Sequence, residues 1–195
     1  MSKGEETKKL IIEKSAAIVN VKGIAATSMS DIMSATKLSK GTLYMYFNSK
    51  DDLACSAVEH NLELLSSKIQ HAIKKHKTAK DKLFAYLDLL EDPINTPVDG
   101  GCPMINSGTE ADDTNPGINA IVNVLVERSQ QLISSIIQKG IKNGEFKSDW
   151  DYHEFSTMMF ALLEGGTIIC RSNGNNEKMK VINNSIKRMI TAQLL

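Results

Sequence analysis

The polar residues best suited to chemistry gather between positions 28 and 50, where hydroxyl, phenol and ammonium groups alternate with apolar residues. Lys40 can reach a guanine edge or a phosphate oxygen, and Thr42 and Tyr44 can reach base edges or methyl groups. This chemistry is non-covalent recognition of a nucleic acid. The elements that carry these side chains must therefore hold them on one exposed surface.

Helix-capping patterns predict the elements that position these groups. Ser28 followed by Asp31 forms a capping box and predicts a short helix over about 29–35. Ser39 can cap a further short helix that runs through Tyr46. Two short helices joined by a tight turn have helix-turn-helix geometry, which presents side chains to a major groove about 12 Å wide.

Helical periodicity continues along the rest of the chain, and no stretch shows convincing period-two alternation. We therefore expect an all-α fold of about nine helices without internal repeats. All four prolines fall within one segment, 93–116, which predicts loops around a short helix near 104–111. The other expected helices are one ending at Lys22-Gly23, a long one opened by Ser49/Asp52, one opened by Thr78/Asp81, and those over 118–141, 151–171 and 176–193.

Composition favours an ordinary soluble protein of the cytoplasm. With 195 residues and 42% hydrophobic content, the chain can bury a core without disulfides or a structural metal. Cys55, Cys102 and Cys170 are widely spaced and form no C-x-x-C pair, as in a reducing compartment. No apolar run approaches the roughly 20 residues that span a bilayer, and the start at 2–9 does not resemble a signal peptide.

Charge is unevenly distributed, although the formal net charge is zero. Residues 1–50 carry eight lysines against four acidic residues, a net charge of +4, so the remainder carries −4. This distribution is expected of a chain that meets a polyanion only through its first segment.

One continuous string carries a family resemblance: Leu38-Ser39-Lys40-Gly41-Thr42-Leu43-Tyr44, followed by Tyr46-Phe47 and Ser49-Lys50. It closely resembles the DNA-binding domain of tetracycline-repressor-like regulators, and the resemblance covers roughly residues 8–55. Two departures occur at Thr36-Lys37, where the family often has Ala-Gly, and at Met33, where a small residue is usual. The resemblance implies a helix-turn-helix domain over 1–50 and a helical effector-binding and dimerisation domain over 51–195.

The same resemblance implies a transcriptional regulator, a homodimeric repressor that a small-molecule effector releases from a palindromic operator. Gly41 would keep its helix close to the phosphate chain, Tyr46 and Lys50 resemble phosphate-binding residues, and Leu43 and Phe47 are expected to pack inside. The residues expected to contact DNA are Ser28, Lys37, Ser39, Lys40, Gly41, Thr42, Tyr44, Tyr46 and Lys50.

The resemblance places the dimer interface on the last two helices. Gly165-Gly166 would let a partner helix approach closely, although a local kink is the alternative. The residues expected at this interface are Leu162, Gly165, Gly166, Ile182, Ile186 and Met189.

The segment Gly100-Gly101-Cys102-Pro103 resembles the start of the sixth helix in one subgroup of these regulators, close to the effector site. Apolar walls with a few polar groups would suit a small apolar or amphipathic effector. Core packing is the alternative role for the apolar members of the set. The expected effector-binding residues are Leu62, Phe84, Tyr86, Cys102, Asn106, Leu125 and Met159.

Two other function classes were weighed. A small-molecule binding or scaffold protein could retain the N-terminal helices without using them on DNA. An enzyme is disfavoured because the four histidines show no H-E-x-x-H pattern and no G-x-S-x-G or phosphate-loop motif occurs, so we expect no catalytic residue, metal or cofactor.

An acidic segment and one cysteine allow further interpretations of the sequence. Glu110, Asp112 and Asp113 are expected to form a solvated acidic loop, because complete calcium-loop spacing is missing. The Cys102 thiol leaves open a redox-sensing form of the regulator.

Overall fold

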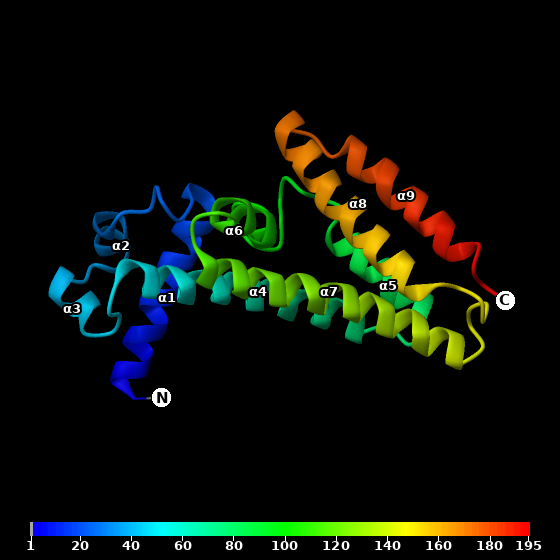
Figure 1. Ribbon diagram of the computed structural model, residues 1–195, viewed down its shortest axis with the longest axis horizontal. Helices are drawn as coiled ribbons and strands as arrows, with labels where there is room; N and C mark the ends of the chain where they lie inside the picture. The colour runs from blue at the N-terminus through cyan, green and yellow to red at the C-terminus, as the bar shows by residue number, and fades with distance from the viewer. Residues whose placement is uncertain (1) are drawn as a thin grey trace. The chain divides into compact units, whose positions relative to one another are not determined.

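The computed structural model describes residues 2–195, and within this range it confirms the all-α fold with nine helices (Figure 1). An isolated bridge between Phe146 and Leu194 is the one β-type pairing among the described residues. The helices are α1 (Lys3–Lys22), α2 (Met29–Thr36), α3 (Lys40–Tyr44), α4 (Lys50–Lys74), α5 (Ala79–Leu89), α6 (Pro103–Ala111), α7 (Pro116–Lys142), α8 (Tyr152–Asn173) and α9 (Glu177–Thr191). None of the described helices is long and apolar enough to cross a membrane.

The described chain divides by packing into two compact units. The first unit holds the residues up to Leu65 together with 98–124, so it combines α1, α2 and α3 with the start of α4, with α6 and with the start of α7. The second unit holds 66–97 and 125–195. The predicted border between residues 50 and 51 separates DNA binding from effector binding, and it stays a prediction. The two packing units follow a different division, because α6 packs with the N-terminal helices.

Caps define the short helices of the first unit. The Ser28 hydroxyl accepts from the Asp31 amide and the Asp31 carboxylate accepts from the Ser28 amide, which confirms the predicted capping box. The Ser39 hydroxyl likewise accepts from the Thr42 amide at 3.1 Å and opens α3. Because α3 spans five residues, it depends on such caps and on packing for its stability.

A small apolar core holds the first unit together. Its fully buried members are Ile11, Ile32, Leu43, Phe47 and Leu53. The expectation that Leu43 and Phe47 pack inside is thus confirmed. Truncating such a buried leucine to alanine costs about 2–5 kcal/mol of folding free energy, so this core is what orients the outward face of α3.

The loop before α6 binds the end of α1 within the first unit. The buried Asn20 amide donates to the carbonyls of Asp99 and Gly101 at 2.6 and 3.1 Å. The Asn106 amide, on α6, donates to the carbonyls of Asn20 and Gly100 at 2.9 and 3.1 Å. Gly100 has φ +96°, and a Cβ there would lie 2.7 Å from the Asn20 carbonyl oxygen, so only glycine fits.

Two close approaches organise the second unit. Along the pair α8 and α9, which run side by side in Figure 1, a Cβ at Gly166 would lie 2.8 Å from Ile182 and 2.9 Å from Met179. On α7, a Cβ at Gly140 would overlap the ring of Phe146.

The Glu145 carboxylate accepts from the Ala79 and Lys80 amides at 2.7 Å each and so caps α5.

Candidate nucleic-acid interface

Helices α2 and α3 are joined by the short turn 37–39. Lys37 adopts a left-handed conformation, with φ 60° and ψ 25°, at the position where the family often has glycine. The buried Thr36 hydroxyl donates to the Ile32 carbonyl at 2.7 Å and accepts from the Leu38 amide at 3.4 Å. These bonds allow a non-glycine turn to keep the geometry that α2 and α3 require.

The predicted DNA-contacting side chains other than Ser28 and Lys50 lie in one stretch around α3. Thr42 and Tyr46 are half-buried, and Lys40 holds its ammonium 5.9 Å from the Tyr44 ring centroid. Gly41 is exposed, and a Cβ there would meet only the Ser39 hydroxyl at 3.9 Å, so the outer surface of α3 is open at that point. The exposed members of the set are Ser28, Lys37, Ser39, Lys40, Gly41 and Tyr44.

Met45 belongs to the same surface, although it was absent from the predicted set. Its side chain is 80% exposed, whereas the neighbouring Leu43 and Phe47 are buried. The exposure of Met45 could have been predicted from helical spacing, because a residue two positions from an inward-facing Leu43 lies on the opposite side of the helix. Such an exposed thioether next to Tyr44 can contact thymine methyl groups.

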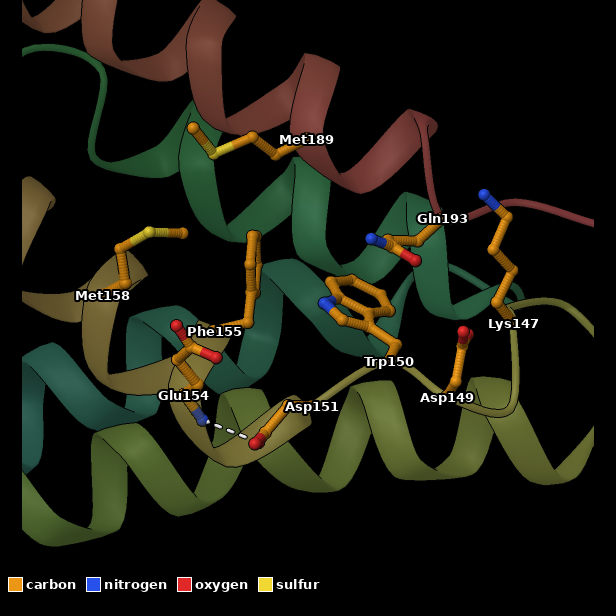
Figure 2. A pocket seen from close by; sticks show the side chains of 9 residues that line it. All are labelled: Lys147, Asp149, Trp150, Asp151, Glu154, Phe155, Met158, Met189 and Gln193. Atoms are coloured by element: carbon orange, nitrogen blue, oxygen red, sulfur yellow. Dashed lines mark hydrogen bonds between the residues drawn. The ribbon is translucent and has the colours of Figure 1, made fainter.

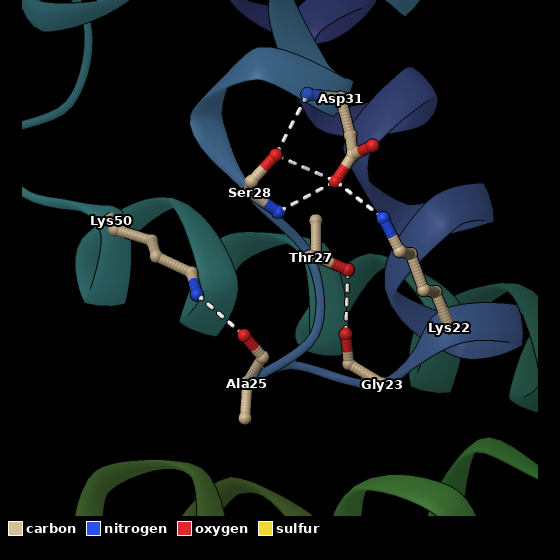
Figure 3. A network of polar contacts seen from close by, with 7 residues as sticks. All are labelled: Lys22, Gly23, Ala25, Thr27, Ser28, Asp31 and Lys50. Atoms are coloured by element: carbon tan, nitrogen blue, oxygen red, sulfur yellow. Dashed lines mark hydrogen bonds and ion pairs between the residues drawn. The ribbon is translucent and has the colours of Figure 1, made fainter.

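Ser28 and Asp31 form a charged network with Lys22 (Figure 3). The Lys22 ammonium bonds the Asp31 carboxylate at 2.7 Å, and the Ser28 hydroxyl donates to the same oxygen at 2.7 Å. First the Lys22 ammonium and then the Ser28 amide and hydroxyl hold the pKa of Asp31 well below its usual range. The Ser28 hydroxyl, predicted as a DNA contact, is thus already engaged in the cap of α2.

Lys50 was predicted as a phosphate-binding residue, and the structure gives its ammonium an internal partner. The Lys50 ammonium donates to the Ala25 carbonyl at 3.1 Å, in the turn between α1 and α2 (Figure 3). In the same turn the Thr27 hydroxyl donates to the Gly23 carbonyl at 2.5 Å. Lys50 therefore braces this turn from the start of α4.

Glu110 of α6 holds the same turn from the other side. Its carboxylate accepts from the Ile24 amide at 2.7 Å and from the Ala25 amide at 2.6 Å. The expectation of a merely solvated acidic loop was wrong for Glu110, because its partner Ile24 lies 86 positions away in the sequence. No group of residues suited to holding a metal ion occurs within the described range.

Comparison with known proteins identifies the family. Residues 11–56 match the family described as bacterial regulatory proteins of the tetR family, and residues 79–186 match the tetracyclin repressor-like C-terminal domain. The chain belongs to the TetR family. The matching domains and relatives are of the transcriptional-regulator type, with an N-terminal helix-turn-helix, rather than of an enzyme type.

Three similar proteins illustrate the family relationship. A TetR-family regulator from Cytophaga hutchinsonii has a TM-score of 0.94 at 31% identity, with 100% of this chain and 98% of that chain covered. A TetR regulator from Chloroflexus aurantiacus has a TM-score of 0.93 at 32% identity, with the same coverage. The fatty acid metabolism regulator protein of Bacillus subtilis is 21% identical over 93% of this chain and 92% of its own length.

The predicted effector residues of this TetR-family chain fall in both compact units. In the first unit, the Asn106 amide is engaged in the loop before α6, Leu62 is buried and Cys102 is half-buried. In the second unit, Tyr86, Leu125 and Met159 are buried, and the Phe84 ring lies 5.5 Å from the ammonium groups of Lys80 and Lys187. A shared effector pocket formed by these residues stays a prediction.

The predicted dimer residues divide into buried and accessible ones. Gly166 and Ile186 are buried, and Gly166 packs against Met179 and Ile182 of its own chain. The close helix approach that Gly166 permits within one protomer is α8 on α9, and the expected contact with a partner helix stays a prediction. Leu162, Gly165 and Ile182 are half-exposed, Met189 is exposed, and Ile168, Ile169 and Val181 add further exposed apolar side chains.

Proposed function

We propose that this TetR-family chain is a repressor that binds a near-palindromic operator as a homodimer and leaves it when a small effector binds. The observation that carries the proposal is the outward face of α3, where Lys40, Thr42 and Tyr44 are accessible while Leu43 anchors the helix in the core. A recognition helix needs this combination of a buried anchor and exposed polar side chains.

Specificity and affinity are proposed to come from different side chains. Thr42, Tyr44 and Met45 would touch base edges and methyl groups, and Lys37 and Lys40 would contact phosphates or a guanine edge. Tyr46 would add a phosphate contact. Lys50 would support the turn between α1 and α2, in line with its bond to the Ala25 carbonyl.

Release from DNA requires a difference in effector affinity between two states of the dimer. Two recognition helices must enter successive major grooves about 34 Å apart, and an effector that favours another spacing weakens operator binding. We propose that α4 transmits the change, because it is one continuous helix whose residues are shared by both compact units.

The effector is proposed to be a small apolar or amphipathic molecule bound near Leu62, Phe84, Tyr86, Cys102, Asn106, Leu125 and Met159. The largely apolar side chains of this set support such a ligand. The name of the Bacillus subtilis relative, a fatty acid metabolism regulator, is consistent with an apolar effector.

Dimerisation is proposed to use the accessible apolar side chains of α8 and α9. Leu162, Gly165, Ile182 and Met189 are retained from the predicted interface, and Ile168, Ile169 and Val181 extend it. Gly166 and Ile186 would act by packing α8 on α9 within each protomer.

A titration of DNA from the chain's own promoter region, followed by fluorescence anisotropy at several salt concentrations, tests the proposal. We expect a preferred palindromic site and a steep loss of affinity with salt, because each neutralised phosphate contributes about 0.9 to the logarithmic slope. A scrambled duplex of equal length is the control. A shallow slope with equal affinity for both duplexes would instead favour the scaffold function.

A further inference from the structure

A pocket of about 630 Å³ lies in the second unit, where the segment between α7 and α8, the first turns of α8 and the end of α9 come together (Figure 2). Its walls include the aromatic rings of Trp150 and Phe155 and the thioethers of Met158 and Met189. Asp149 and Glu154 add carboxylates. None of these six residues except Met189 has a role in the proposed function.

The aromatic wall of the pocket is held in place by ring packing. The Trp150 ring lies 4.8 Å from both Phe146 and Phe155, centroid to centroid, in edge-to-face contacts. Trp150 is 8% exposed, so most of its indole is packed against neighbouring side chains while the rest lines the pocket.

The charge of the pocket is negative. Asp149 and Glu154 form no ion pair and no side-chain hydrogen bond within the described range, whereas Asp151 accepts from the His153 and Glu154 amides as the cap of α8. The one lysine of the lining, Lys147, donates its ammonium to the Ala192 carbonyl at 2.7 Å. Two carboxylates thus remain available to a positive ligand.

We propose that this pocket binds a small organic cation with an apolar body, such as a protonated amine attached to a hydrocarbon or aromatic group. The apolar body packs against Trp150, Phe155 and the two methionines, because flexible thioethers adapt to ligands of irregular shape. The ammonium group faces Glu154 and is attracted by the electron-rich face of the indole, and Asp149 adds to the negative charge of the pocket. This site goes beyond the proposed function, and its occupancy is measurable without DNA.

Trp150 is the single tryptophan of the chain, so its fluorescence reports on the pocket directly. The full-length protein is titrated with 2-phenylethylammonium, with neutral 2-phenylethanol and with 3-phenylpropanoate, which share the phenylethyl group and differ in charge. We expect a saturable change with the ammonium compound, at least about threefold weaker binding of the alcohol and none of the carboxylate. Equal binding of the ammonium compound and the alcohol, or no saturable change, overturns the proposal.

A matched pair of variants tests the role of the carboxylate. Glu154→Gln is expected to weaken 2-phenylethylammonium binding about threefold and to leave the alcohol unchanged, as befits a partly solvated charge pair. Glu127→Gln makes the same change at an exposed α7 residue outside the pocket and is expected to have no effect. Equal effects of the two variants, or an unchanged ammonium affinity in Glu154→Gln, overturn the proposal, and thermal unfolding verifies that both variants fold.

Discussion

Individual residues of α3 divide sharply into buried and outward-facing ones. Leu43 is fully buried, whereas Tyr44 is 45% exposed and Met45 is 80% exposed. Because neighbouring side chains differ this much, single substitutions can alter the outer surface without disturbing the core. Readout of bases and contact with phosphates can therefore be separated experimentally.

Thr42→Ala is expected to change which operator sequences are preferred, because it removes a hydroxyl and a methyl group that are proposed to contact base edges. Lys40→Ala is expected to weaken binding to all sequences and to reduce the logarithmic salt slope by about 1, as for a phosphate contact. Competition binding with single-base operator variants at several salt concentrations measures both effects. A change of base preference in Lys40→Ala alone would assign base readout to Lys40 instead.

Asp92 predicts a defined pH dependence of stability. The Asn95 side chain and amide, assisted by Asn176 and the Ile94 amide, lower the pKa of Asp92 to about 2. The pKa of an aspartate in the unfolded chain is near 4. Ionised Asp92 therefore stabilises the fold fully above about pH 4, and this stabilisation is lost as the pH falls towards 2.

Asp92→Asn should therefore cost less than about 1 kcal/mol of unfolding free energy near neutral pH, because the carboxylate is well solvated, and nothing near pH 2. Urea unfolding between pH 2 and 7 measures this difference, with Asp113→Asn at an exposed position as the control. A constant difference between wild type and Asp92→Asn across this range would rule out the carboxylate as its source.

At the scale of elements, local caps were predictable and distant contacts were not. Ser28, Ser39 and Thr78 each accept from the amide three residues ahead, so short-range spacing was enough to place the starts of α2, α3 and α5. The bonds from Glu110 and Lys50 to the turn before α2 join residues 86 and 25 positions apart, and no sequence period encodes them.

Glu110→Gln is expected to loosen the turn before α2, because one amide oxygen cannot replace two carboxylate oxygens for both backbone donors. Loss of a hydrogen bond to a charged group costs about 1.5–3 kcal/mol, so amide exchange at Ile24 and Ala25 should accelerate at least about tenfold. Hydrogen exchange followed by NMR measures this, with Asp112→Asn as the neighbouring control. Unchanged exchange at both amides would show that Glu110 does not hold the turn.

Two glycines in long helices should respond oppositely to alanine. Gly140→Ala is expected to destabilise the protein by about 1–3 kcal/mol, because the new methyl group overlaps the Phe146 ring. Gly165→Ala meets no atom within 4 Å and should stabilise the protomer by about 1 kcal/mol through helix propensity. Thermal and urea unfolding compare the two variants, and similar stabilities would contradict the packing around Gly140.

At the scale of the whole molecule, the positive charge gathers in the first 50 residues, and a group of exposed apolar side chains lies on the last two helices. The first 50 residues carry the net charge of +4, whereas the exposed Ile168, Ile169, Val181 and Met189 all belong to α8 and α9. A protein that meets DNA with one end of its sequence and a second copy with the other is expected to show this distribution.

Val181→Glu is expected to weaken dimerisation at least about tenfold, because it places a charge among the apolar side chains of the proposed interface. Val181 is 63% exposed in the protomer, so the fold should tolerate the change. Sedimentation equilibrium measures the dimer, and Val21→Glu, at a 68% exposed position of α1, is the control. A Val181→Glu protein as dimeric as the control would move the interface elsewhere.

The left-handed backbone of Lys37 lowers the stability of the fold but places a positive charge in the turn before α3. A side chain other than glycine pays roughly 1–2 kcal/mol to adopt this backbone conformation. In exchange, the chain gains a positive charge at the tip of the turn, where it can draw in a polyanion during diffusional encounter. Lys37→Gly is therefore expected to relieve the backbone strain and to remove one positive charge that could attract DNA.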